Sequence, residues 1–479
     1  MKMKTKQFYF GMFVALMATM FTACSSSDEA QNEQGAQLKL SAGITAQKET
    51  YNIGEWGAII DIGDIDASYA KESVYKPKAE NTRTPIDDNN WEGMSDRNIA
   101  VQIGSNAVSK STINANGNIT MPSTYYFTGM DNVAVKSWYP YSSSLSSFAV
   151  RSDQTALANY EKSDLLYASV NVNQSSPNAQ LTYSHKTAKI IFYITMKDSK
   201  YLYDPTINSV TLSNIYTSGS VSNGAITASG SVGSVKMYNS VATATSSNYV
   251  TTATFEACIV PQNRAIKYNI VYGSGTYSGT LASKNILAGK VYTVNVTMTV
   301  LPYVDLGLPS GLKWARMNVG ARTATEYGDW YMWGNDFGYN DNYHAYYKGT
   351  EELTPTGGHD TAHNLWGSPW RMPTMNEFQE LLSNCTWTSV TNQVNYNGCN
   401  GLIFTSKKNG RTMFMPSNGW VFYETNEHSG YTQGASYWTA TPIDANHAKW
   451  VTWLWGSPSD VHIDNFSKED GFGIRPVCD

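Results

Sequence analysis

The chain has 479 residues, which is too many for one hydrophobic core, so we expect two or three domains. Its net charge is −5 and it contains no basic block, which argues against a nucleic-acid partner. Only 15% of the residues are charged, while Tyr, Ser, Thr, Asn and Gly are plentiful, as is typical of an all-β surface protein rather than a cytosolic enzyme.

The N-terminus has the composition of a signal peptide. Three lysines within the first six residues precede an uncharged apolar run over residues 8–21, which is shorter than the ~20 residues that span a bilayer. The run ends in Phe21-Thr22-Ala23-Cys24, which resembles the lipobox that lipoprotein signal peptidase cuts before its cysteine. This resemblance implies that residues 1–23 are removed and that Cys24 is acylated, for example with palmitate. The alternative is an ordinary signal peptide with a coincidental cysteine.

Residues 24–37 are polar and have no periodic pattern, so we expect a flexible tether there. Ser25-Ser26-Ser27-Asp28-Glu29 resembles the acidic serine tract that sends Bacteroidota lipoproteins to the outer face of the outer membrane. The resemblance implies a surface-exposed protein that meets the membrane only through its lipid.

The chain from residue 38 to residue 300 has the alternation of β-strands. Leu38, Leu40, Ala42, Ile44 and Ala46 share one face of a predicted strand, with polar residues between them. The same pattern recurs over residues 188–196 and 292–300. One apolar and one polar face predict antiparallel sheets that cover a core on one side, as in β-sandwiches.

Several segments of this region resemble the fimbrillin family of Bacteroidota (type V) pilus subunits. The resemblance implies two tandem, transthyretin-like β-sandwich subdomains, at residues 38–160 and 161–300, with a seam near residues 155–165. The segments, in order, are Thr82-Arg83-Thr84, Asp96 to Val101, Ser163 to Ala168, Leu181 to Lys186, Val260-Pro261-Gln262 and Leu287 to Val294.

The family resemblance also implies donor-strand exchange, in which an arginine-specific protease removes the first strand and a strand of another pilin fills the gap. Arg83 is the first arginine in the chain, so such a cut removes the lipid, the tether and the strand that begins at Leu38. The alternative is that Arg83 is a turn residue with no role in processing.

Composition changes sharply after residue 300. Residues 1–300 contain three of the fourteen tryptophans and residues 301–479 contain eleven, which predicts a domain boundary. A stalk pilin donates a strand from its own C-terminus, whereas this chain runs from the strand ending at Val300 into another globular unit. The order of units therefore predicts a subunit that accepts a strand but does not donate one, as expected at a pilus tip.

The last region, residues 301–479, resembles the C-type-lectin-like domain found in paralogous extracellular proteins of Bacteroidota and Fibrobacter. The resemblance implies a compact α+β unit with a long irregular loop region that displays ligand contacts. It rests on Tyr303 to Ala315, Asn318-Val319-Gly320-Ala321, Glu326-Tyr327-Gly328-Asp329, Trp370 to Thr374, Tyr437-Trp438 and Gly473 to Val477.

Local signals within residues 301–479 predict helices and turns independently of that resemblance. Thr374-Met375-Asn376-Glu377 is a capping box at the start of an amphipathic helix, and Asp360 to Trp366 is expected to form a short helix before it. Asn397-Gly398 and Asn409-Gly410 are hairpin turn signals.

Export permits disulfides. The lectin-like resemblance implies a bridge between Cys385 and Cys478, which leaves Cys399 and Cys258 free. A bridge between Cys385 and Cys399 is the rival pairing, and the sequence does not separate the two.

No cofactor is predicted. His359 and His363 lie four residues apart on the expected helix, but a third metal ligand is not evident. Calcium is the usual cofactor of lectins, yet the Glu-Pro-Asn, Gln-Pro-Asp and Trp-Asn-Asp motifs of calcium-dependent sugar sites are absent from the sequence.

Aromatic side chains are the candidates for ligand contact, because exposed rings stack on sugar faces or anchor protein partners. The alternative is that these rings belong to the core of a loop-rich domain. The candidates are Trp420, Tyr423, Trp450, Trp453 and Trp455.

Together these features predict a non-enzymatic pilus-tip adhesin of the cell outer membrane and fimbrium, with other pilins and a surface glycan or protein as partners. A surface glycan-binding lipoprotein that never polymerises is the first alternative. A metal-dependent or glycan-processing hydrolase is the second, and the paired carboxylates or clustered ligands that it needs are not found in sequence order.

Overall fold

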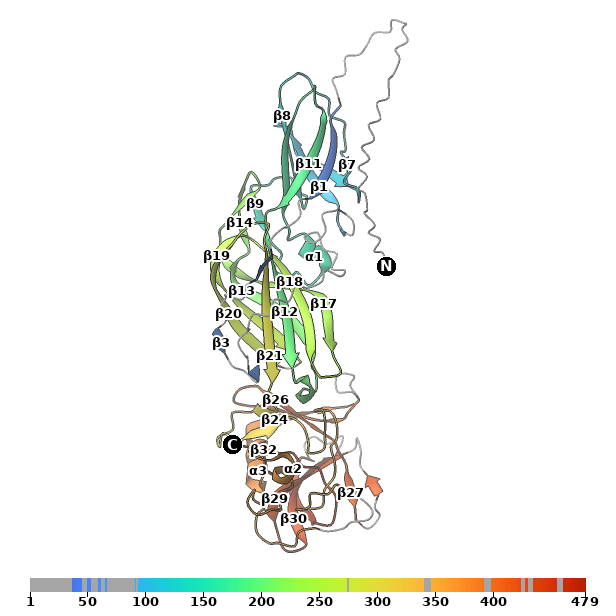
Figure 1. The fold of residues 1–479 in the computed structure, drawn as a ribbon, viewed down its shortest axis with the longest axis vertical. Coiled ribbons are helices and arrows are strands. Elements are labelled where there is room, and N and C mark those ends of the chain that lie inside the picture. Colours follow the sequence, from blue (N-terminus) through green and yellow to red (C-terminus); the bar gives the residue numbers. More distant parts are fainter. Residues whose placement is uncertain are drawn as a thin grey trace, which may run out of the picture.

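The computed structural model describes residues 37–44, 50–52, 59–61, 65–66, 91, 94–273, 275–339, 346–391, 398–423, 427–429, 434–454 and 460–479. This part of the chain is mostly β-strand, which confirms the mainly-β fold class. Three units follow one another along the long axis of the molecule (Figure 1). We refer to them as the N-terminal, middle and C-terminal units. Within the described residues, no helix has the length and hydrophobicity needed to cross a membrane.

The N-terminal unit is a single seven-stranded sheet wrapped around its own core. Its core side chains include Ile99, Val101, Val135, Leu181 and Tyr183, which are all buried. The strands, in spatial order, are β1 (Lys39–Ile44), β11 (Asn178–His185), β10 (Leu166–Val172), β8 (Val133–Tyr139), β5 (Asn98–Ile103), β6 (Ser109–Ile113) and β7 (Ile119–Thr120).

The predicted seam between the first two units lies between residues 160 and 161, and the observed seam lies later in the chain. The hairpin of β10 and β11 hydrogen-bonds to β8 and therefore belongs to the N-terminal sheet, although the predicted boundary assigns it to the second subdomain. The sheets change between His185 and Ala188. The expected seam comes from the family resemblance, and short sequence motifs do not show which sheet the hairpin that follows them joins.

The middle unit is a β-sandwich. Its two sheets bury one shared core, in which Phe192 and Phe255 of one sheet meet Tyr268 and Ile270 of the other. The first sheet has β17 (Tyr238–Thr245), β18 (Thr251–Ile259), β12 (Ala188–Lys197), β21 (Val291–Val300) and β2 (Thr50–Asn52), with β4 (Ile65–Asp66) also paired to β21. The second has β16 (Val232–Lys236), β13 (Ile207–Tyr216), β19 (Gln262–Tyr272), β20 (Gly275–Ile286) and β3 (Ile59–Asp61).

The predicted apolar faces of β12 and β21 are confirmed, because their alternate residues all lie in this core. The sheets are not wholly antiparallel, however. β12 runs parallel to β21, and β1 runs parallel to β11. Smaller elements lie between the first two units: β9 (Ser147–Ala149), α1 (Leu157–Glu161), β14 (Ser218–Ser222) and β15 (Ala225–Ala228). The 3₁₀ turn η1 (Ser199–Tyr201) follows β12 at the other end of the middle unit, where the Ala324 amide donates to the Lys200 carbonyl at 3.0 Å.

Two of the fimbrillin-like segments meet at the seam in a buried polar cluster. Nδ1 of His185 lies 2.7 Å from a carboxylate oxygen of Asp164, and the Thr187 hydroxyl donates to the other carboxylate oxygen at 2.7 Å. All three residues are buried. A buried carboxylate needs hydrogen-bond partners, and His185 and Thr187 supply them to Asp164.

The C-terminal unit is built of small sheets and two helices. The predicted helices are confirmed: α2 (Thr361–Trp366) begins after the Asp360 cap, and α3 (Met375–Asn384) begins with the full capping box of Thr374 and Glu377. The strands are β22 (Tyr303–Asp305), β23 (Lys313–Ala315), β24 (Cys385–Val390), β25 (Gly401–Ser406), β26 (Thr412–Pro416), β27 (Trp420–Phe422), β28 (Glu427–Ser429), β29 (Gly434–Pro442), β30 (His447–Leu454), β31 (His462–Ser467) and β32 (Val477–Cys478).

Candidate functional site

The first strand, β1, is held by backbone hydrogen bonds on both of its edges. One edge pairs in parallel with β11 over its whole length, from Lys39 opposite Asn178 to Ile44 opposite Tyr183. On the other edge, the Leu38 amide donates to the Tyr125 carbonyl at 3.1 Å and the Ala42 amide donates to the Gly117 carbonyl at 2.8 Å. β1 therefore closes the gap between the two ends of the N-terminal sheet, and its loss would leave two unpaired edges.

The side chains of β1 follow the predicted alternation as far as they are described. Leu38 is 2% exposed and packs in the core, Leu40 and Ala42 are half-buried, and Lys39 and Ser41 face solvent. The structure describes this strand as far as Ile44, and Ala46 lies outside the described residues. Among the side chains of β1 that the structure describes, Leu38 alone is fully buried, which makes β1 a small plug compared with the long central strands.

Gly117 fits against β1 only because it has no side chain. Its φ is +81°, and a Cβ at this position would lie 2.2 Å from the Ala42 carbonyl oxygen. We expect Gly117→Ala to push β1 away and to weaken its attachment by about 1–3 kcal/mol, since both the backbone strain and the clash must be relieved. Faster hydrogen exchange at the Ala42 amide measures this effect.

Gly129→Ala is the matched control for that substitution, because it lies in the same unit with open space around it. Equal exchange at Ala42 in both variants would contradict the expected role of Gly117.

The chain after β1 continues along the middle unit. β2 pairs with β21 near Val291, β3 pairs with β20 near Ser278, and β4 pairs with the end of β21 at Thr299 and Val300. β2, β3 and β4 thus cover an edge of each sheet of the middle unit. None of these three strands is predicted from the sequence, because each is only two or three residues long and shows no alternation.

Arg83 and Cys24 lie outside the described residues, so their roles remain predictions. Downstream of Arg83, the chain is fixed from Trp91 onward: this ring is 1% exposed and meets Tyr183 edge-on at 5.1 Å between centroids. The Ser95 amide then donates to a Glu161 carboxylate oxygen at 3.0 Å. These contacts join the chain after Arg83 to β11 and α1 and not to β1 itself.

Trp453, one of the five aromatic candidates, belongs to the core of the C-terminal unit, so its assignment to a ligand site is wrong. Its side chain is 2% exposed, stacks on Tyr437 at 5.5 Å between centroids and donates its indole N–H to the Ser417 hydroxyl at 3.3 Å. Trp455 lies outside the described residues.

Trp420 and Trp450 are half-buried and lie at two ends of an aromatic row. Trp420 is 5.8 Å from Phe422, which is 5.9 Å from Phe466, which is 5.1 Å from Trp450, all measured between ring centroids. The indole nitrogens of both tryptophans are buried without a hydrogen-bond partner among the described atoms. The row therefore packs β27 against β30 and β31.

Tyr423 is the most exposed of the five candidates in the described chain, at 41%. It directly follows β27, and its amide donates to an Asp470 carboxylate oxygen at 2.8 Å, which fixes its backbone.

Two further exposed side chains, Phe337 and Leu365, are not predicted from the sequence, because single apolar residues in polar loops carry no periodic signal. Their neighbours Asp336 and Asn364 are joined by a 2.9 Å hydrogen bond.

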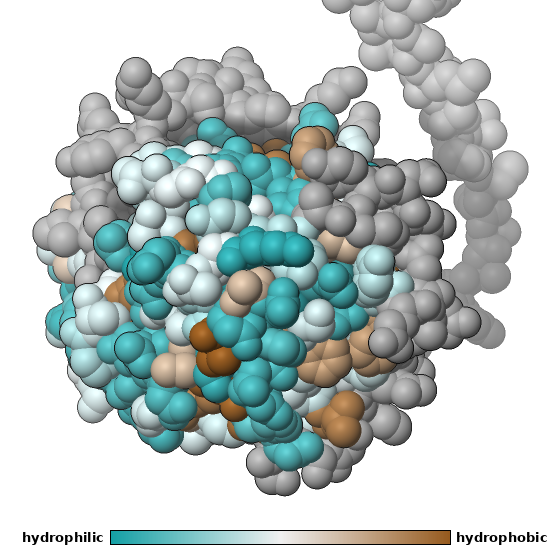
Figure 2. All heavy atoms as spheres, turned by 90° about the horizontal axis from the view of Figure 1, so that it is seen from below, coloured by the Kyte–Doolittle hydropathy of each residue, from teal (hydrophilic) through white to brown (hydrophobic). Residues whose placement is uncertain are grey.

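Seen from the end formed by the C-terminal unit, the molecule is mostly polar, with hydrophobic residues in small separate patches (Figure 2). Such a surface suits a ligand that combines polar groups with a few apolar contacts better than a large hydrophobic partner.

The two histidines of the possible metal site point to different neighbours. His359 stacks on Tyr347 with 3.6 Å between ring centroids, and Nδ1 of His363 lies 3.1 Å from the Trp370 carbonyl oxygen. Among the described residues, no group of three or more His, Cys, Asp or Glu side chains could hold a metal ion.

The predicted disulfide between Cys385 and Cys478 is not present in the structure, and neither is its rival with Cys399. The four described cysteines, which include Cys258, are buried and form no disulfide with one another. Cys385 begins β24 and Cys478 ends β32, and these strands belong to different sheets.

Burial raises the pKa of Cys385 to about 11 and that of Cys399 to about 12. At pH 8 a thiol with a pKa of about 11 is ionised in only about one molecule in a thousand, so we expect native Cys385 and Cys399 to resist iodoacetamide. Peptide mass spectrometry before and after unfolding in guanidinium measures the difference. Rapid alkylation of the native protein at pH 8 would contradict the buried positions.

Residues 80–309 match the model of a family described as fimbrillin-like. Among solved structures, the chain is similar to a proposed cell adhesion protein from Bacteroides ovatus ATCC 8483, with 15% identity, a TM-score of 0.37, and 55% of this chain and 92% of that chain covered. It is also similar to a fimbrial protein from the same strain, with 10% identity, a TM-score of 0.30, and 92% and 99% covered. A proposed cell adhesion protein from Bacteroides uniformis ATCC 8492 has 18% identity, a TM-score of 0.33, and 42% and 89% covered. No curated protein sequence matches the chain.

Proposed function

Because residues 80–309 match the model of the fimbrillin-like family, we propose that the protein is a pilus subunit that accepts a donor strand and presents its C-terminal unit as an adhesive head. Its role is structural and adhesive rather than enzymatic. It is exported as a lipoprotein acylated on Cys24, reaches the outer face of the cell outer membrane and enters the fimbrium.

The observation that carries the proposal is the position of β1. The strand is bonded on both edges, contributes one fully buried leucine and lies before the first arginine of the chain. Removing it creates a groove with two unpaired edges that a strand of the same length from another subunit fills. Because Trp91 and Ser95 anchor the chain after Arg83, the N-terminal unit keeps its remaining core when the strand leaves.

Arg83 is the proposed processing site. Edman sequencing of the assembled protein tests this: we expect an N-terminus at Thr84. An N-terminus upstream of Leu38 would sink the strand-exchange proposal. If cleavage occurs at Arg83, the acylated Cys24 is a temporary tether and not a permanent anchor.

A position at the pilus tip follows from the order of units. β21 ends at Val300 and the chain continues directly into the C-terminal unit, so no free C-terminal strand is available from this end of the middle unit. Immunogold labelling of surface filaments tests the position. Label at filament ends is expected. Label only on the cell surface would favour the non-polymerising, glycan-binding lipoprotein.

The C-terminal unit is the proposed adhesive head with a lectin-like fold, and Tyr423 is its best-placed aromatic contact. On a glycan or cell-surface ligand found by array screening of the full chain, Tyr423→Ala is expected to weaken binding at least about tenfold, because exposed aromatic anchors dominate such interfaces. Tyr126→Ala is the matched control, since Tyr126 is 38% exposed but lies in the N-terminal unit. Unchanged binding by Tyr423→Ala would mean that another part of the C-terminal unit contacts the ligand. Repeating the array with a calcium chelator tests the expected independence of calcium.

A further inference from the structure

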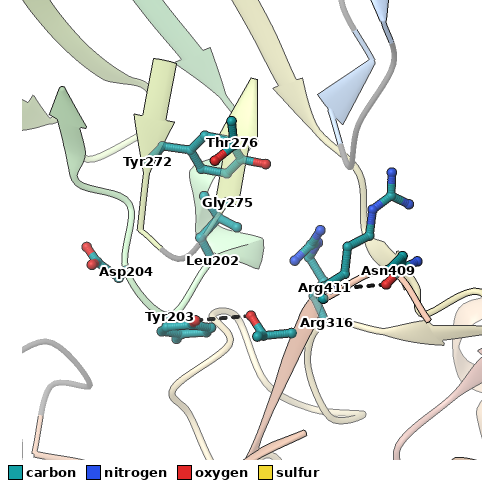
Figure 3. A pocket seen from close by; sticks show the side chains of 11 residues that line it. Leu202, Tyr203, Asp204, Tyr272, Gly275, Thr276, Arg316, Asn409 and Arg411 are labelled. Carbon is teal, nitrogen blue, oxygen red and sulfur yellow. Dashed lines mark hydrogen bonds between the residues drawn. The ribbon is translucent and has the colours of Figure 1, made fainter. Parts of the chain in front are cut away.

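The joint between the middle and C-terminal units holds one tyrosine of the middle unit in an apolar seat. Tyr203 follows the 3₁₀ turn η1, and its hydroxyl lies 3.3 Å from the Thr412 hydroxyl of the C-terminal unit (Figure 3). Its ring packs against the Phe414 ring at 5.8 Å between centroids. Phe414 forms a small buried cluster with Val390 and Cys399, and the Tyr203 ring packs against this cluster, which we call the seat.

A second contact across the joint is made by backbone atoms. The Ala324 amide of the C-terminal unit donates to the Lys200 carbonyl of η1 at 3.0 Å. Ala324 is buried, so we expect its amide to exchange with solvent only when the two units separate at this point. The exchange rate of this amide therefore reports how often the joint opens.

The covalent connection between the two units is short and is tied to the C-terminal unit. β21 ends at Val300 and β22 begins at Tyr303, so Leu301 and Pro302 form the connection. The Arg316 amide donates to the Pro302 carbonyl at 2.9 Å, and Nε of Arg316 donates to the Leu301 carbonyl at 3.0 Å. The connection thus moves with the C-terminal unit, and bending is expected where β21 passes into Leu301.

A polar cavity of about 250 Å³ lies within the joint (Figure 3). Tyr203 and Thr412 line it beside the seat, and Arg316 lines it beside the connection. The two units are therefore not packed together across the whole joint. Because contacts between domains of one chain hold firmly only where they are large and apolar, we expect the seat of Tyr203 to carry much of the attachment.

We propose that Tyr203 is a latch. While its ring is seated against Phe414, the C-terminal unit stays in line with the middle unit, as in Figure 1, and the two units move as one body. When the ring leaves the seat, the C-terminal unit swings about the end of β21. One aromatic anchor can dominate a small interface, so this side chain sets the balance between the two states. For an adhesive head the latch fixes the direction of the ligand site, a consequence that rests on the proposed function.

Hydrogen exchange of the full-length protein at the Ala324 amide tests the latch. Tyr203→Ala is expected to raise the exchange rate at least about tenfold, because the closed joint no longer buries the ring. Tyr203→Phe keeps the ring and is expected to raise the rate less than about threefold. Phe414→Leu reduces the seat from the other side, and adding it to Tyr203→Ala is expected to change the rate little further, since both remove the same contact.

Two controls separate opening of the joint from other changes. The Asp329 amide donates to the Val319 carbonyl at 3.0 Å within the C-terminal unit, so unchanged exchange there excludes local unfolding of the loops around Ala324. Tyr126→Ala changes an exposed tyrosine of the N-terminal unit and is expected to leave exchange at Ala324 unchanged. Equal exchange at Ala324 in Tyr203→Ala and in the unmodified protein overturns the proposal, as does an equal rise at Asp329.

Pulsed electron spin resonance measures the swing itself. Spin labels are attached through unnatural amino acids at Lys267 of the middle unit and Asn465 of the C-terminal unit, which are both exposed. We expect one narrow distance distribution in the otherwise unmodified protein and a broad distribution in Tyr203→Ala. Narrow distributions in both would contradict the latch. Neither measurement needs a ligand or cleavage at Arg83, so the result is independent of whether the proposed function holds.

Discussion

A precursor that carries Leu38→Asp is expected to release β1 without proteolysis. Leu38 is 2% exposed in the core of the N-terminal unit. The substitution removes about 2 kcal/mol of apolar burial and adds several kcal/mol for enclosing a carboxylate among apolar side chains. Because β1 lies between two sheet edges, we expect its detachment to cost less free energy than burying the carboxylate.

Hydrogen exchange at β11, which pairs with β1 along its whole length, measures the release. We expect the amides that bond to β1 to lose protection, while those between β8 and β5 keep theirs. A peptide of residues 37–46 added in excess is expected to restore protection, because it supplies the missing strand. The same groove is the one that a donor strand would enter.

Ser41→Asp is the control for this experiment. Ser41 lies on the same strand but faces solvent, so a carboxylate there meets water and not the core. Release of β1 by both variants would mean that any added charge detaches the strand. Release by neither would mean that Leu38 does not hold β1, and the argument for a small removable plug would fail.

Much of the middle unit could be predicted from the sequence, because its strands alternate cleanly and bury one face. The predicted strands over residues 188–196 and 292–300 correspond to β12 and β21 within one or two residues. Their parallel pairing could not be predicted. Periodicity reports which side chains are buried, whereas the partner of each strand depends on the whole topology.

The aromatic candidates show the same limit in the C-terminal unit. Alternation correctly places Trp450 and Trp453 on opposite faces of β30. Both faces are covered, however: Trp453 packs with Val451 in one core cluster, and Trp450 packs against the cluster that contains Ala448. Because a core cluster lies against each face of β30, alternation alone could not identify an exposed tryptophan.

Some motifs of the C-terminal unit owe their sequence to contacts with one another. Gly320 has a φ of +81°, and a Cβ there would lie 2.3 Å from a carboxylate oxygen of Asp329. Gly328 makes the reciprocal close approach to the other segment, because a Cβ added to Gly328 would lie 2.3 Å from the Val319 carbonyl oxygen. Two segments that look independent in the sequence therefore form one tightly packed loop pair, which explains why they occur together.

Arg475→Ala is expected to destabilise the C-terminal unit by about 3–5 kcal/mol, as is usual when one member of a buried charged hydrogen-bond cluster is removed. The Arg475 side chain is fully buried, and its burial lowers the pKa of the guanidinium. Nε donates to the Asn318 side-chain oxygen at 2.8 Å, and Nη1 donates to the Ala315 carbonyl at 3.0 Å. Truncation leaves both acceptors without a donor and opens a cavity beside Tyr437.

Urea unfolding followed by tryptophan fluorescence reports this change selectively, because eleven of the fourteen tryptophans lie after residue 300. Arg475→Lys keeps the charge but cannot reach both acceptors with one planar group, so an intermediate loss is expected. Arg322→Ala, on the exposed surface of the same unit, is expected to change stability by less than about 0.5 kcal/mol. If Arg475→Ala lowered the free energy of unfolding no more than Arg322→Ala, the Arg475 guanidinium would not be the group that holds β23, Asn318 and β32 together. Its presence in the last motif of the chain would then need an explanation outside the core, in ligand binding.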